Sequence, residues 1–99
     1  MKTLPVIFRK YTSNGDILAI FPTLPALHSS PHTVTCYEHI GQHGSMAYGY
    51  MEPHTVKASP SEYAELYAEL ITIGYNNLKV VQRRSTKMID EAIEYLNSL

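Results

Sequence analysis

The chain has 99 residues and a formal net charge of −1, with 44% hydrophobic and 17% charged residues. A domain of this length buries about two-thirds of its unfolded surface, so one domain over residues 1–99 is expected to fold without a structural disulfide. The charge balance does not favour nucleic-acid binding, and the single cysteine, Cys36, excludes a disulfide framework and a cysteine zinc site. The absence of a signal-peptide core and of a membrane-length apolar run predicts a cytoplasmic protein with no membrane partner.

The first two elements are predicted to form a β-hairpin. Residues 5–11 and 17–21 are rich in β-branched and aromatic side chains, and 12-TSNGD-16 lies between them. Asn-Gly is a strong hairpin-turn signal because both residues tolerate positive φ. Pro22 is expected to end the second strand because it lacks the N–H that a ladder needs, and the proline-rich residues 22–32 are predicted to form a loop.

A third strand is predicted over 33-TVTCYEHI-40. Strand alternation places Val34 and Cys36 on one face and Tyr37 and His39 on the other, so Cys36 is expected to be a buried small hydrophobe. Residues 46–51 are a weaker candidate for a fourth strand, because Gly49 lacks a side chain that could pack on the sheet.

The C-terminal half predicts two helices around a short strand. Ser59-Pro60-Ser61-Glu62 is a helix start with a capping box, an apolar stripe at helical spacing follows, and Gly74 ends the helix. Residues 78–83 indicate a strand and residues 86–98 a second helix. Arg83, Arg84 and Lys87 are expected to form a solvated edge.

These elements predict an α+β fold in the order β-β-β-(β)-α-β-α. We expect a single antiparallel sheet of four or five strands, with one helix across a face and a C-terminal helix. Residues 85–99 are expected to be a helical extension whose apolar residues dock on the sheet or on another copy of the chain. A homo-oligomer is one way to bury them.

Three strings and a helix together carry a resemblance to a known group of proteins. The chain contains 6-VIFRKYTSNGDILAIFP-22, 39-HIGQHG-44, a capped acidic helix and 74-GYNNLKVVQR-83. This pattern resembles a family of small uncharacterised proteins encoded by bacterial phages, plasmids and integrative elements. The resemblance implies an accessory protein acting inside a bacterium, and it implies no catalytic or binding residue.

The segment 39-HIGQHG-44 is the most unusual local feature, and it allows four readings. A metal site would use His39 and His43 with His54 or Glu52, but such sites need three or four converging ligands. A nucleophilic enzyme would need Cys36 or Ser45 beside a base. A hairpin turn would need only the positive φ that glycines supply.

The fourth reading, a recognition surface, is the one that the residue types favour. Tyrosine and histidine supply rigid surfaces with polar tips, and glycines allow close approach of a partner. The predicted surface comprises Tyr37, His39, Gln42, His43 and Tyr48. The expected function is therefore a binding module for a host protein or a small nucleotide-like ligand, without a cofactor. The alternative is a small histidine-dependent enzyme or a metal-binding protein.

Overall fold

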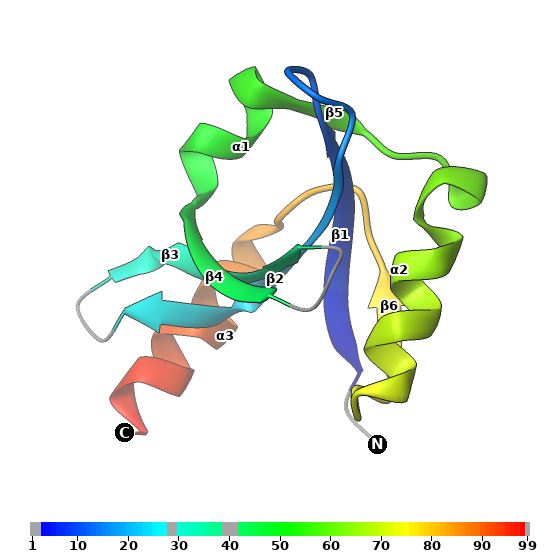
Figure 1. Cartoon of the computed structure of the whole chain (residues 1–99). Coiled ribbons are helices and arrows are strands. Elements are labelled where there is room, and N and C mark those ends of the chain that lie inside the picture. Colours follow the sequence, from blue (N-terminus) through cyan, green and yellow to red (C-terminus); the bar gives the residue numbers. More distant parts are fainter. Residues whose placement is uncertain (1–2, 28–29, 39–41, 99) are drawn as a thin grey trace.

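A computed structural model describes residues 3–27, 30–38 and 42–98, and it shows an α+β fold. Strands and helices alternate in the second half of the chain, after an N-terminal run of strands (Figure 1). The elements are β1 (Leu4–Tyr11), β2 (Ile17–Leu27), β3 (Ser30–Glu38), β4 (Gln42–Ala47), α1 (Tyr48–His54), β5 (Thr55–Lys57), α2 (Pro60–Thr72), β6 (Leu78–Val80) and α3 (Thr86–Asn97). The predicted class and the predicted main helices are confirmed, with α1 and β5 as additional elements.

The sheet is a curled antiparallel meander with one parallel pairing. Its strand order is β4-β3-β2-β1-β5, and β6 also pairs with β1. Two short strands share β1 as a partner besides β2. Strand β5 pairs with Arg9–Tyr11, and β6 runs parallel to Leu4–Val6. Every residue of β1 therefore has a strand partner, and Arg9 and Lys10 have one on each side.

The hairpin between β1 and β2 forms as predicted, with Gly15 at a φ of +78°. The prediction that Pro22 ends β2 was wrong. The register moves from Phe21 opposite Thr35 to Pro25 opposite Val34, so an irregularity of the ladder accommodates the proline, whose nitrogen cannot donate a ladder hydrogen bond. Strand β2 consequently continues to Leu27 instead of becoming a loop.

The predicted fourth strand over 46–51 was also wrong in its bounds. Strand β4 begins at Gln42, which pairs with Glu38, and it ends at Ala47. The chain then turns into α1, and Met51 of this helix is buried against the sheet. Gly49 explains why the strand does not continue to residue 51, because a strand gains little from a residue without a side chain.

Apolar side chains fill both faces of the sheet. One cluster lies under α2 and is built from alternate strand residues together with the helix residues Leu66 and Leu70; it comprises Val6, Phe8, Ala19, Phe21, Tyr37, Ala58, Leu66 and Leu70. The other cluster lies on the opposite face and comprises Ile7, Leu18, Ile20, Val34, Cys36, Met46 and Met51. Cys36 is buried beside Val34, as predicted.

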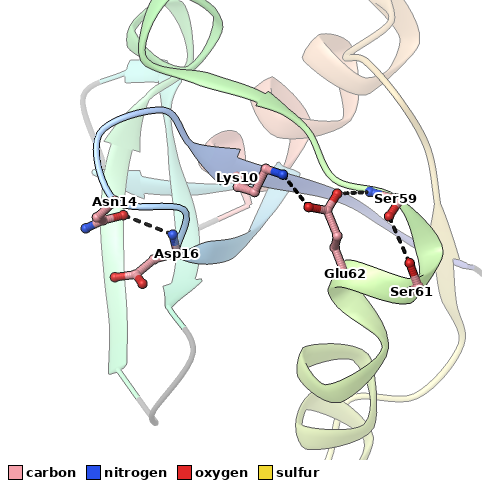
Figure 2. A network of polar contacts seen from close by, with 6 residues as sticks. All are labelled: Lys10, Asn14, Asp16, Ser59, Ser61 and Glu62. Carbon is pink, nitrogen blue, oxygen red and sulfur yellow. Dashed lines mark hydrogen bonds and ion pairs between the residues drawn. The ribbon is translucent and has the colours of Figure 1, made fainter.

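Helix α2 begins with the predicted capping arrangement (Figure 2). The Glu62 carboxylate accepts a hydrogen bond from the Ser59 backbone N–H at 2.9 Å and pairs with the Lys10 ammonium. Lys10 and the Ser59 N–H together lower the pKa of Glu62 to about 2. The ion pair thereby connects the start of α2 to the C-terminal end of β1.

Arg84 departs from the prediction of a solvated edge. Its guanidinium donates to the carbonyls of Pro22 and Pro31, and it lies 5.3 Å from the centroid of the Tyr48 ring. The Arg84 backbone N–H also donates to the Tyr48 hydroxyl at 2.7 Å. Burial lowers the pKa of this guanidinium. Arg84 therefore joins β2, β3 and the start of α1.

Candidate functional site

The end of α2 places one aromatic ring at the edge of the core. Gly74 has a φ of +118°, its N–H donates to the Ile71 carbonyl at 3.2 Å, and the Tyr75 N–H donates to the Leu70 carbonyl at 3.0 Å. This pair of bonds is the Schellman arrangement that commonly ends helices at a glycine. The arrangement turns the chain back, so that the half-buried Tyr75 packs on the core cluster beneath α2.

Strand pairing places a second ring beside the first. His43 of β4 stands directly opposite Tyr37 of β3. Directly paired residues share a face of the sheet, so both side chains lie on the face that α2 covers. The two rings meet edge to face, with centroids 4.7 Å apart and an interplanar angle of 74°.

Hydrogen bonds and ring contacts join these residues into one cluster. His43 Nε2 lies 2.8 Å from the Tyr75 hydroxyl oxygen, and Tyr75 stacks on Phe21 at 4.9 Å between centroids. The Tyr37 hydroxyl donates to the Glu69 carboxylate. Side chains of β2, β3, β4 and the α2 terminus are therefore held in one fixed arrangement, as a preorganised site requires.

A surface hollow of about 520 Å³ lies against this cluster. It is lined by Tyr37, His43, Ile73, Gly74 and Tyr75. Ile73 is 48% exposed beside it, although isoleucine is among the residues most often buried in folded proteins. The lining thus offers aromatic rings, an apolar side chain, an imidazole and a hydroxyl group around a small concave space.

The tyrosines of the hollow are held in their neutral form. The hydrogen bond to Glu69, with burial and the nearby charge, raises the pKa of Tyr37 to about 12. Burial also raises the pKa of Tyr75 above its usual value. Neither hydroxyl group is a ready nucleophile near neutral pH, so both are suited to hydrogen bonding.

The five residues predicted as a recognition surface have different positions. Tyr37 and His43 are in contact and line the hollow. The backbone of Gln42 pairs with Glu38 at the start of β4, and His39 lies outside the described residues. Tyr48 belongs to another part of the molecule, where it contacts Arg84.

Three residues of the hollow were missed at the sequence level. Ile73, Gly74 and Tyr75 follow α2, and Gly74 had been interpreted only as a helix stop. The available signal was the aromatic residue directly after that glycine, because the residue after a Schellman glycine commonly packs back on the helix.

The groups needed for the other readings lie apart. Within residues 3–27, 30–38 and 42–98, no three His, Cys, Asp or Glu side chains gather as metal ligands would. His54 is stacked on Tyr50 at 3.7 Å between ring centroids. Burial raises the pKa of the Cys36 thiol, which makes the nucleophilic thiolate harder to form.

Comparison with protein-family models, curated proteins and solved structures gives no match for this chain. In the described part of the chain, no helix has the length and apolar character needed to cross a membrane.

Proposed function

We propose that this protein is a binding module that captures a planar group in the hollow between β4 and the end of α2. The observation that carries the proposal is the joining of Tyr37 and His43 with Tyr75 and the exposed Ile73 around one concave space. Pockets for small ligands combine an apolar and aromatic lining with a few well-placed polar groups.

The lining chemistry favours a flat, largely apolar group with a polar edge. Aromatic side chains pack on such groups by stacked or edge-to-face contacts. His43 and Tyr75 can exchange hydrogen bonds with a polar edge, since imidazole and phenol groups both donate and accept. A nucleobase and an aromatic side chain of a partner protein share this chemistry.

The biological setting belongs to the same proposal. The resemblance to small proteins of phages, plasmids and integrative elements suggests an accessory protein that acts in the bacterial cytoplasm. Its partner would then be a host protein or a small nucleotide-like ligand. The alternative is a histidine-dependent enzyme or a metal-binding protein, and the experiment below separates the metal-binding protein.

The proposal is tested by NMR titration of the ¹⁵N-labelled protein with adenosine and with N-acetyl-tryptophanamide. We expect one of these probes to shift the amide signals of Tyr37, His43 and Tyr75. Ile73→Ala should weaken that binding about fivefold, because partial burial of this side chain is worth about 1 kcal/mol.

Ile71→Ala is the matched control. Ile71 is 46% exposed, close to the 48% of Ile73, but it does not line the hollow. Equal effects of the two variants, or no shift with either probe, would contradict the proposal. Stoichiometric zinc in native mass spectrometry, lost in His43→Ala, would establish the metal-binding alternative.

A further inference from the structure

Strand β4 is the terminal strand of the sheet, and it lies beside the hollow. Its partner in the strand order is β3, and no other described strand pairs with it (Figure 1). In an antiparallel ladder, every second residue of a terminal strand directs its N–H and C=O away from its neighbour. The outer edge of β4 therefore presents backbone donors and acceptors at a spacing of two residues.

The sequence of this edge lacks the usual protection against strand addition. Proteins commonly block an edge with lysine, proline, inward-pointing charges or a bulge. Strand β4 reads Gln-His-Gly-Ser-Met-Ala, without a charged residue or a proline, and its six pairs with β3 run in unbroken register. His43, Gly44, Ser45 and Ala47 are exposed.

The hollow and the edge share one residue. His43 lines the hollow and also belongs to the edge strand. A strand added to β4 would lie about 4.8 Å away, and its residue opposite His43 would have its Cβ within about 5.5 Å of the histidine Cβ. That residue would direct its side chain to the face on which Tyr37, His43 and Tyr75 cluster.

A second copy of this chain does not suit the site as its occupant. Pairing of β4 with β4 of another copy would present His43, Ser45 and Ala47 on the face of the hollow, since these residues alternate along the strand. The methyl and hydroxymethyl groups of Ala47 and Ser45 are too small to fill about 520 Å³, so His43 is the one larger side chain that the copy would offer on this face, and it is not apolar. Met46 is on the opposite face and buried in the core. A different chain with a large apolar or aromatic side chain fits better.

We propose that β4 accepts an extended peptide segment of a partner protein as a seventh strand, and that one aromatic or large apolar side chain of this segment occupies the hollow. This inference rests on the proposed function and identifies the ligand as part of a peptide chain. Strand addition supplies affinity through main-chain hydrogen bonds, and pockets for alternate side chains supply specificity.

The test uses random heptapeptides displayed on phage and selected against the full chain. Enriched peptides are synthesised and then N-methylated at one position at a time. We expect methylation at alternate positions to weaken binding at least tenfold, and methylation at the positions between them to change it less than threefold. Selected peptides should carry a shared aromatic or large apolar residue, and their binding should weaken in Ile73→Ala but not in Ile71→Ala.

Enrichment of no peptide, or binding without the alternating pattern, would overturn the inference. If N-acetyl-tryptophanamide or adenosine still shifts the signals of the hollow in that case, the proposed function stands without strand addition. If neither small molecules nor peptides bind, both proposals fail.

Discussion

Replacing Arg84 tests whether a half-buried guanidinium stabilises this fold. The side chain donates to the carbonyls of Pro22 and Pro31 and contacts the Tyr48 ring. Hydrogen bonds from charged donors are worth about 1.5–3 kcal/mol each, and a cation–π contact about 0.5–2 kcal/mol. These contributions are not additive, and water can replace part of them at a half-exposed site.

We therefore expect Arg84→Ala to lower the free energy of unfolding by about 2–3 kcal/mol, and the melting temperature by on the order of 10 °C. Arg84→Lys should recover only part of this loss, because an ammonium group lacks the planar fork that reaches two carbonyls. Urea denaturation measures the free energy of unfolding and thermal denaturation measures the melting temperature, both monitored by circular dichroism. Arg83→Ala is the control, since Arg83 is exposed and should change stability by no more than about 0.5 kcal/mol. Equal stability of the two alanine variants would refute the bracing role of Arg84.

Three other predictions concern the helices. Leu66→Ala should destabilise the protein by about 2–5 kcal/mol in the same denaturation assay, because Leu66 is 1% exposed in the cluster under α2. A change within experimental error would contradict the packing of α2 on this cluster. The lowered pKa of Glu62 predicts a contribution to stability that is present at pH values above 4.5, the pKa of this group in the unfolded chain, and is lost as the pH falls towards 2. Glu62→Gln should therefore flatten this part of the curve of stability against pH. Parallel curves for the two proteins would contradict this prediction. Ile93 and Tyr95 are 40% and 44% exposed on α3. If they form the homo-oligomer that the sequence allows for this helix, light scattering should give a dimer mass that Ile93→Glu returns to that of the monomer. A monomer mass for the unmodified protein would exclude it.

Local chemistry explains why the first hairpin and α2 could be predicted. Gly15 supplies the positive φ of the turn, and the Asn14 side chain accepts from the Asp16 N–H at 2.9 Å (Figure 2). Ser59 and Glu62 mark the start of α2, and Gly74 marks its end. Each of these signals lies within a few residues of the structure that it determines.

The remaining features depend on contacts between distant residues. Strand β2 passes Pro22 because β3 tolerates a change of register, which no local signal at the proline reveals. The role of Arg84 depends on carbonyls 53 and 62 residues away. Three of the five residues that line the hollow were missed, and the meeting of His43 with Tyr75 spans 32 positions of sequence.

The shared edge of β1 also constrains the order in which the chain can fold. The first residues of β1, Leu4–Val6, pair with β6, and the Val81 N–H that follows β6 donates to the Val6 carbonyl at 2.9 Å. The paired residues are 74 positions apart in the sequence, as for Leu4 and Leu78, and β6 follows α2. During synthesis, Leu4–Val6 must therefore wait for this partner until β6 has left the ribosome. Closing so long a loop is slow, and this parallel pairing is expected to be among the last steps of folding.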